Sequence, residues 1–258
     1  MIKKQLNILI KHNWQPLVPL AAILLLWHFT GVSGFIPSYL LPGPGQVLAA
    51  FVADFPLLMR HLQRTLLEAT VGLLMAAAAS VVLAIAMDTN RLLNRSLSPL
   101  LLLTQTMPTV AVAPLLILWM GYGIAPKIAL VFLVCFFPMT IGLLGAFAQT
   151  DEDTVRLLRS MGASRRQIYR YIKLPGSLPA FFSGLKIAGA YSIVGAVIAE
   201  WLGGDAGLGV YMIRVRRSYS FDKMFAVILL TSVLSIALVK LLGILERTAM
   251  PWKKKSKE

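Results

Sequence analysis

Long apolar runs alternate with short polar segments along this chain. The runs cover about residues 17–35, 66–87, 97–119, 128–147, 178–201 and 224–245. An α-helix needs about 20 apolar residues to cross the hydrocarbon core of a bilayer, and most of the runs approach or exceed that length. Because lipid offers the backbone no hydrogen-bond partners, such segments cross it as helices. The pattern predicts an all-α, polytopic membrane protein with about six transmembrane helices.

Prolines interrupt the pattern in two places. The segment LLPGPGQV at residues 40–47 opposes a regular helix at its start, and the apolar stretch that follows, about residues 46–59, is short for a span. We expect this stretch to form an interfacial helix outside the membrane. In the third run, Pro108 and Pro114 each remove an amide donor. That helix is therefore expected to be kinked or locally unwound.

The composition supports this class and argues against others. Of the 258 residues 57% are hydrophobic and 14% charged, whereas soluble domains carry about a quarter charged residues. The net charge of +14 comes from basic residues between the apolar runs, which suits anionic lipid better than nucleic acid. One cysteine, Cys135, and three scattered histidines give no disulfide framework or metal spacing. The spans hold almost no acids, which disfavours a membrane enzyme or a secondary transporter.

The distribution of lysine and arginine predicts the orientation. Counted over alternate segments, those at the two termini, after the second run and at residues 150–175 hold more than twice as many basic residues as the others. The positive-inside rule then places both termini in the cytoplasm. The basic residues Arg214, Arg216 and Arg217 lie on the predicted outside and run against this rule.

The longest polar segment, residues 150–175, has the pattern of a helical hairpin. Thr150 and Asp153 have the spacing of a capping box, and Gly162 is placed to end the first helix. Ser164 and Gln167 form a second capping box, which begins another helix at once, and Pro175 is expected to stop it before the next span. On physical grounds alone, a loop that contacts lipid headgroups and a hairpin that docks on a partner are equally acceptable.

A resemblance favours docking. The run G-x9-I-x-L-P, formed by Gly162, Ile172, Leu174 and Pro175, resembles the cytoplasmic coupling loop of ATP-binding-cassette (ABC) importer permeases. The acidic-Ala-Ala triplet of that family is replaced here by Arg156, Leu157 and Leu158.

Further segments are similar to the nitrate, sulfonate and taurine branch of that family. They are LLPGPGQV at 40–47, MPTVAVAPLLILWMGYG at 107–123, FFPM at 136–139 and AEWLGGDAGLGVYM at 199–212. The last of these, with the RVRRSYSFDKMFA that follows, looks most like permeases for thiamine pyrimidine precursors.

The resemblance implies a type I ABC importer permease in a bacterial inner membrane, folded as a single transmembrane domain over residues 1–258. Its parts are an N-terminal span with a periplasmic segment (1–64), a core bundle (65–248) that contains the coupling loop, and a basic tail (249–258). The implied partners are two cytoplasmic ATPase subunits, a second permease copy in a homodimer, an extracytoplasmic binding protein and lipid, without nucleic acid. No P-loop occurs in the sequence, so ATP and Mg²⁺ are expected on the ATPase, with no enzyme activity and no cofactor in this chain. The solute is expected to be small and polar: a thiamine pyrimidine precursor, or alternatively a sulfonate, taurine, nitrate or riboflavin.

The resemblance and the polarity of the spans also assign candidate residues. The coupling loop is expected to act through Arg159, Gly162, Ala163, Ser164, Arg165, Ile172, Leu174 and Pro175. The candidates for the translocation path or its gate are Thr106, Pro108, Thr109, Ser192 and Glu200. Hydrogen bonding between helices explains the threonines and the serine equally well, and Glu200 is equally acceptable as an interfacial carboxylate. Lys186, within the fifth run, is expected to snorkel or to dock on the coupling loop.

Overall fold

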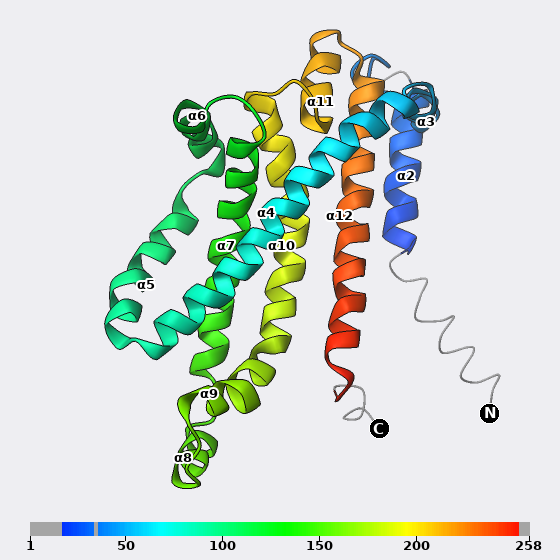
Figure 1. Ribbon diagram of the computed structural model, residues 1–258. Coiled ribbons are helices and arrows are strands. Elements are labelled where there is room, and N and C mark those ends of the chain that lie inside the picture. Colours follow the sequence, from blue (N-terminus) through cyan, green and yellow to red (C-terminus); the bar gives the residue numbers. More distant parts are fainter. Residues whose placement is uncertain (1–16, 34–35, 253–258) are drawn as a thin grey trace, which may run out of the picture. The chain divides into compact units, whose positions relative to one another are not determined.

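The computed structural model describes residues 17–33 and 36–252, and within these it is helical with no β-strand (Figure 1). In chain order the helices are α2 (Leu17–Val32), α3 (Pro44–Ala53), α4 (Phe55–Thr89), α5 (Arg91–Thr106), α6 (Thr109–Met120), α7 (Ala125–Ala148), α8 (Glu152–Ser160), α9 (Arg165–Ile168), the π-helical turn η1 (Tyr169–Lys173), α10 (Leu174–Leu202), α11 (Leu208–Arg217) and α12 (Phe221–Ala249). The predicted all-α class is confirmed. The basic N-terminal segment and most of the basic tail lie outside the described residues.

Four helical segments in the described ranges are long and apolar enough to cross a membrane. They are α4, α7, the continuous stretch Arg165–Leu202 and α12. The pair α5 and α6 makes a fifth if it is counted as one broken span, and the 16 residues of α2 cover the first predicted run. A multi-pass membrane protein is therefore confirmed, with four or five full-length spans where the sequence predicted about six.

The chain divides into two compact units, described separately here. The first comprises residues 1–58 and 212–229, and the second comprises residues 59–211 and 230–258. In the first unit, the indole of Trp27 donates to the carbonyl of Pro42 at 3.0 Å and stacks on Phe225. The ammonium of Lys223 pairs with the carboxylate of Asp54 at 2.8 Å. These contacts attach the proline-rich segment to α2, and they attach α2 and the α3–α4 junction to the start of α12.

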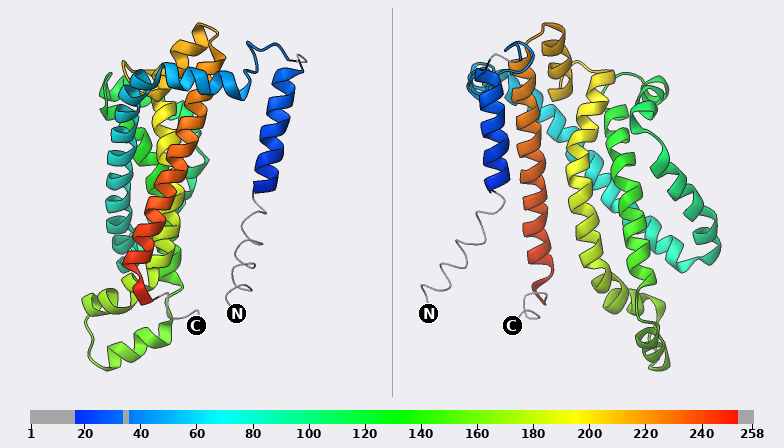
Figure 2. Two further views of the ribbon diagram at one scale, coloured as in Figure 1. Left: turned by 90° about the vertical axis from the view of Figure 1, so that its right-hand side faces the viewer. Right: turned by 180° about the vertical axis from the view of Figure 1, so that it is seen from behind.

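The second unit has its core between α4, α7 and α10, which lie side by side (Figures 1 and 2). Small side chains dominate the contact, with Ala69 from α4 and Ala188 from α10 among its buried members. At Gly72 a Cβ atom would lie 2.6 Å from Val131 of α7, so the two helices approach more closely than any larger residue allows. Small residues serve this purpose in membranes, where packing replaces the hydrophobic effect as the force between helices.

Two sequence predictions about helix boundaries are corrected, and one further helix is found. The expected interruption near residues 59–66 is absent, because α4 is one continuous helix with Pro56 in its first turn, where a missing amide costs nothing. The expected loop after the second span is largely helical, since Asn90 caps α5 through its side chain. The segment after the fifth span, for which the sequence analysis predicted no element, contains α11.

The third run is broken as predicted. Helix α5 ends at Thr106, α6 begins at Thr109, and the two axes differ by 104°. The break lies at Met107 and Pro108, while Pro114 lies within α6 without interrupting it. The structure therefore assigns the unwinding to the first of the two prolines.

Candidate functional site

The hairpin of α8 and α9 begins with a side-chain cap. The carboxylate of Asp151 accepts hydrogen bonds from the amides of Asp153 and Thr154, both at 3.2 Å, and from the Thr154 hydroxyl at 2.5 Å. The N-cap is thus Asp151, and the predicted box of Thr150 with Asp153 is wrong by one position. The hydroxyl of Thr154, followed by the two amides, holds the pKa of this carboxyl below its usual range.

Gly162 closes the first helix as predicted. Its φ of +86° lies in the left-handed region, and its amide donates to the carbonyl of Arg159 at 3.0 Å while the amide of Ala163 donates to Leu158 at 2.9 Å. Ser164 and Gln167 then form the predicted capping box, with the Ser164 amide 2.7 Å from the Gln167 side-chain oxygen. Local sequence therefore determines the whole turn.

The second helix does not stop at Pro175, and this prediction is wrong. Helix α9 continues through η1 into α10, with Pro175 in the first turn of α10 and Pro179 inside it. Because Arg165–Leu202 is one continuous helical stretch, Pro175 removes an amide donor within it, and the π-helical turn η1 directly before it is the kind of local adjustment that accommodates such a proline. Within a membrane helix, neighbouring segments can compensate for the second proline.

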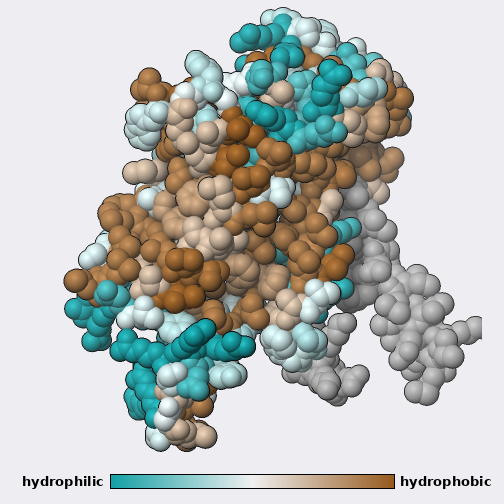
Figure 3. Space-filling model, viewed as in Figure 1, coloured by the Kyte–Doolittle hydropathy of each residue, from teal (hydrophilic) through white to brown (hydrophobic). Residues whose placement is uncertain are grey.

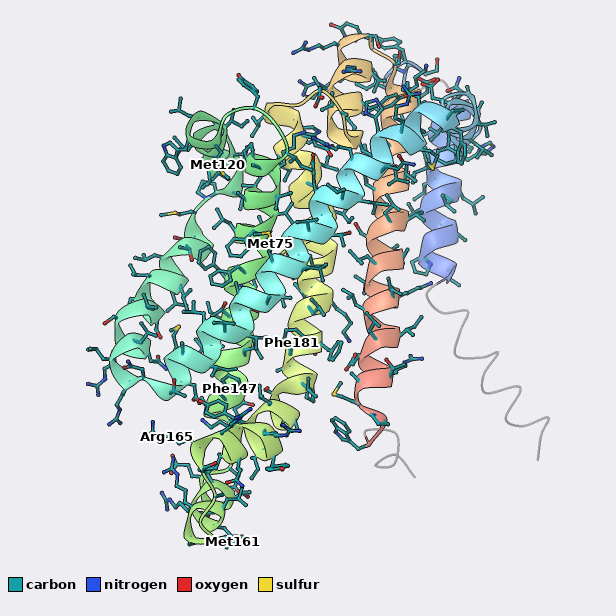
Figure 4. The ribbon with its side chains drawn as sticks, viewed as in Figure 1. Met75, Met120, Phe147, Met161, Arg165 and Phe181 are labelled. Atoms are coloured by element: carbon teal, nitrogen blue, oxygen red, sulfur yellow. The ribbon has the colours of Figure 1, made fainter. Side chains whose placement is uncertain are left out.

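The predicted coupling residues fall into two groups along this segment. Arg159, Gly162, Ser164 and Arg165 are exposed and Ala163 is half-buried around the turn, while Ile172, Leu174 and Pro175 are half-buried where the hairpin joins the bundle. Leu174 packs against a cluster that contains Phe147 of α7. Figure 4 shows Met161 at the tip of the hairpin and Arg165 on its flank near Phe147. Figure 3 shows polar surface gathered on the hairpin below the apolar surface of α4 and α5.

A polar anchor that the sequence analysis missed attaches the hairpin to the bundle. Asp88, at the end of α4, accepts from the hydroxyl of Tyr169 and from the ammonium of Lys173, the latter at 2.5 Å. The ring of Tyr169 meets Phe147 edge to face, and Ile168 beside it is buried. Movement of the hairpin is thereby linked to the ends of α4, α7 and α10.

At the opposite end of α10, side chains from two helices cap α11. The buried carboxylate of Glu200 accepts from the amide of Gly209 at 2.5 Å and from the hydroxyl of Thr65 at 2.7 Å. That hydroxyl in turn accepts from the amide of Leu208 at 2.9 Å, and the ring nitrogen Nδ1 of His61 accepts from the amide of Gly207 at 3.0 Å. Three consecutive amides at the start of α11 are thus bound by side chains of α4 and α10.

A buried ion pair supports this arrangement. The ammonium of Lys127, on α7, lies 3.3 Å from Glu68 Oε1, and both side chains are at most 1% exposed. Arg64 donates to the same oxygen at 3.2 Å. Glu68 Oε2 has no hydrogen-bond partner among the described residues. We call Thr65, Glu68, Lys127, Glu200 and His61 the buried polar cluster.

Glycines in the 203–209 segment make room for the buried polar cluster. Gly207 has a φ of +128°, and a Cβ atom there would overlap the carboxylate of Glu200. A Cβ atom on Gly209 would overlap the carbonyl of Val197, and one on Gly204 would lie 2.7 Å from Lys127 Nζ. The glycines of the sequence GGDAGLG therefore serve close approach between backbone and buried charge. Exposed Asp205 beside them has a lowered pKa, because its own amide and then the nearby cations Lys127 and Arg64 favour its carboxylate.

The structure places the five candidates for the translocation path or its gate in three different environments. Thr106, Pro108 and Thr109 line a cavity of about 800 Å³ between the α5–α6 break, α7 and α10. Ser192 is fully buried and donates to the carbonyl of Gly189 at 2.8 Å, so it serves the helix backbone. Glu200 belongs to the buried polar cluster, and its 2% exposure excludes the interfacial carboxylate. Lys186 pairs with Glu246, near the end of α12, at 2.7 Å, and this ion pair gives its ammonium a partner on another helix.

One signal for the buried polar cluster was present in the sequence. Glu68 lies in a predicted span, and a carboxylate there requires a partner. Arg64, four residues earlier, is readable as one such partner, but Lys127 is 59 residues away, and nothing local predicts that contact. In the described part of the chain, no group of histidine, cysteine and acidic residues could hold a metal ion.

Comparison with known proteins identifies the family. Residues 69–250 match the family model for the binding-protein-dependent transport system inner membrane component. The formylaminopyrimidine transport permease protein ThiX of Halalkalibacterium halodurans is 33% identical, and the match covers 95% of this chain and 99% of ThiX. The riboflavin transport system permease protein RibX of Chloroflexus aurantiacus is 30% identical over 91% of this chain and 88% of its own length. The taurine transport system permease protein TauC of Escherichia coli is 28% identical over 90% and 87%.

A solved structure shares the fold. The inward-facing MetNI methionine ABC transporter superposes with a TM-score of 0.68 at 18% identity, covering 76% of this chain and 97% of that one. Together, the family match over most of the chain and the permease relatives at 30% and 33% identity decide the assignment. The chain belongs to the inner membrane components of binding-protein-dependent transport systems, as the permease subunit of an ABC importer rather than an enzyme.

Proposed function

We propose that the hairpin of α8 and α9 receives the motion of a cytoplasmic ATPase and passes it to the transmembrane bundle. The observation that carries this proposal is the contrast within the hairpin. Its turn, at Arg159, Gly162 and Ser164, is exposed, whereas its base is tied to α4 and α7 through Tyr169 and Lys173. An exposed tip on an anchored base can both bind a partner and transmit its displacement.

The assembly that we propose has two permease copies, two ATPase subunits and one extracytoplasmic binding protein. A single hairpin in each chain suits a homodimer of permeases. ATP and Mg²⁺ are placed on the ATPase subunits, since the sequence contains no P-loop. The basic hairpin supports a cytoplasmic location for that end of α10 and for both termini, in a bacterial inner membrane.

The buried polar cluster is proposed to hold the outer gate of the path. It fixes residues 203–209 and the start of α11 to α4, α7 and α10, at the end of α10 opposite the hairpin. In this proposal Glu200 positions the gate and does not contact the solute. Thr106, Pro108 and Thr109 lie in the cavity beside the path.

The solute that we propose is a thiamine pyrimidine precursor. The 33% identity to a formylaminopyrimidine permease, over nearly the full length of both chains, supports this choice. Sulfonate or taurine, nitrate and riboflavin remain the alternatives, and relatives named for riboflavin and taurine share 30% and 28% identity.

Substitution of Gly162 tests the coupling role. The variant Gly162→Leu places a bulky side chain in a left-handed position at the exposed turn, where no neighbouring atom lies within 4 Å of the added Cβ. We expect the variant to insert into the membrane normally. Its complex should lose stimulation of ATP hydrolysis by the solute-loaded binding protein, because the turn no longer fits the ATPase surface.

A matched control is available at the other end of the bundle. Gly121 also has a positive φ, +77°, and open space around its Cβ, so Gly121→Leu imposes backbone strain away from the hairpin. This control should keep the ATPase subunit bound and stimulated. Unchanged stimulation in Gly162→Leu would show that the hairpin does not couple ATP hydrolysis to transport.

A further inference from the structure

The cavity between the α5–α6 break, α7 and α10 has the size and lining of a ligand site. Its volume of about 800 Å³ lies within the range of small-molecule pockets, about 300–1,000 Å³. Phe137 of α7 and Tyr191 of α10 supply aromatic surface, and aliphatic side chains complete most of the wall. The hydroxyl groups of Thr104, Thr106 and Thr109 are its polar elements beside that of Tyr191.

No charged side chain lines this cavity among the residues that the structure describes. The lysines of the neighbouring spans are engaged elsewhere, Lys127 with Glu68 and Lys186 with Glu246. An anion such as a sulfonate would therefore lose its water without gaining a cation, and that transfer is strongly unfavourable. The lining favours a solute without net charge.

The hydrogen-bonding pattern favours a solute that donates. The hydroxyl protons of Thr104 and Thr106 are committed to the carbonyls of Leu101 and Leu103, both at 2.7 Å. Their oxygens keep lone pairs that can accept. Pro108, at the break, has no amide to donate. An amino or amide group on an aromatic ring can donate to these two threonine oxygens, and the hydroxyls of Thr109 and Tyr191 can donate to a ring nitrogen.

One feature works in the opposite direction. The N-terminus of α6, at Thr109, offers backbone amides that would attract a negative charge. This partial charge is weak beside a full cation, and the apolar walls oppose an ionic occupant. The balance therefore stays with an uncharged ligand.

We propose that this cavity binds an uncharged, planar heteroaromatic solute carrying an amino or amide N–H group, of the aminopyrimidine class, and that it disfavours sulfonates. Tyr191 and Phe137 supply surface for the ring, and the threonine oxygens accept from the N–H group. This inference rests on the proposed transport function. It adds that the permease itself contributes to solute selectivity alongside the binding protein.

Cysteine protection in the complete transport complex tests the proposal. The chain has one native cysteine, Cys135, which is fully buried with its thiol directed at the carbonyl of Ala188, so background labelling is low. Separate variants Val112→Cys and Val194→Cys place thiols on two sides of the cavity, at lining residues to which the proposal assigns no ligand contact. The matched control Leu118→Cys lies on α6 but outside the cavity, with Leu118 77% exposed. The uncharged reagent N-ethylmaleimide labels all three, with 4-amino-2-methylpyrimidine or taurine as competitor.

We expect the pyrimidine to slow labelling of both cavity variants and taurine to leave it unchanged. A competitor at about ten times its dissociation constant slows the reaction about tenfold. The control should respond to neither compound. Protection by taurine, or by neither compound, would overturn the proposal, as would cross-linking of the cavity thiols between two permease copies, which would mark an interface.

ATP hydrolysis by the same transport complexes distinguishes a failure of this inference from a failure of the function on which it rests. If solute-loaded binding protein still stimulates hydrolysis while the pyrimidine gives no protection, the cavity assignment alone is wrong. If the permease does not retain an ATPase subunit at all, the transport proposal fails and this inference fails with it.

Discussion

Charged side chains form ion pairs in the hairpin that precedes α10 and in the buried polar cluster at the other end of α10, but the two pairs differ in their surroundings. At the hairpin, Arg156 pairs with Glu152 on the same helix at 2.8 Å, with the two side chains 71% and 82% exposed. In the buried polar cluster, Lys127 pairs with Glu68 across two helices, and both are at most 1% exposed. The two residues of the hairpin pair are close in sequence and exposed to solvent, whereas those of the cluster pair are distant in sequence and buried.

This difference determines what each end can do. An exposed pair at i,i+4 contributes about 0.3–0.5 kcal/mol, so the hairpin surface can exchange its contacts for those of a partner at small cost. Removing one member of a buried pair costs about 3–5 kcal/mol, because the remaining charge stays desolvated. The hairpin is suited to docking, and the buried polar cluster is suited to holding one conformation.

The largest loss of stability is expected at Gly207, compared here with Gly162, which also has a positive φ. In Gly207→Ala the added methyl group overlaps the carboxylate of Glu200 and disturbs its bonds to Thr65 and Gly209. Backbone strain of about 1–2 kcal/mol then adds to the cost of leaving buried hydrogen-bonding groups unsatisfied, about 1–3 kcal/mol, for a total of about 2–5 kcal/mol. Gly162→Ala meets open space, so only the strain applies.

Unfolding of the two variants in detergent micelles measures this difference. Wild-type protein and both variants are compared under the same denaturant series, and Gly207→Ala should lose at least about twice as much stability as Gly162→Ala. Equal losses would mean that Gly207 is needed only for its backbone conformation and that Glu200 does not fill the space beside it.

The next largest loss of stability, about 3 kcal/mol, is expected from Lys127→Met. This variant leaves Glu68 buried with Arg64 as its remaining cationic partner. The double variant Glu68→Gln with Lys127→Met removes both charges and should recover most of the loss. The matched exposed change, Arg156→Met, should cost less than about 1 kcal/mol. Thermal unfolding of the purified wild-type permease and of the three variants measures these differences in stability. A double variant as unstable as Lys127→Met would show that the two charges are not coupled.

The same contrast explains how much the sequence could predict. The hairpin turn is determined by residues close together in the sequence. The helix end at Gly162 and the capping box of Ser164 with Gln167 were therefore predictable. The cap of α8 was displaced by one residue, because Thr150 and Asp151 are both good capping residues and pattern alone does not choose between them.

The buried polar cluster could not be predicted in this way. Lys127 follows a glycine-rich turn and has the pattern of a loop cation, yet the fold brings it against Glu68 of another helix. Helix α11 was missed for a similar reason: its N-terminal amides are capped by His61, Thr65 and Glu200, which lie on two other helices. Helix class and most spans follow from hydrophobic periodicity, whereas these contacts depend on tertiary packing.

The smallest effect concerns the response of the hairpin to pH. The pKa of Asp151 is lower in the folded hairpin than in an unfolded chain, because the Thr154 hydroxyl and two amides bind its carboxylate. Its contribution to α8 is therefore fully present above the ordinary aspartate pKa, about 4, and is lost as pH falls through the lower folded value. Hydrogen exchange of the α8 amides, corrected for intrinsic rates, should show protection declining on acidification below about pH 4. Asparagine also caps helices but does not titrate in this range, so Asp151→Asn should retain α8 and remove that decline. A decline of the same size in both proteins would assign it to other acids of the hairpin, such as Glu152 and Asp153.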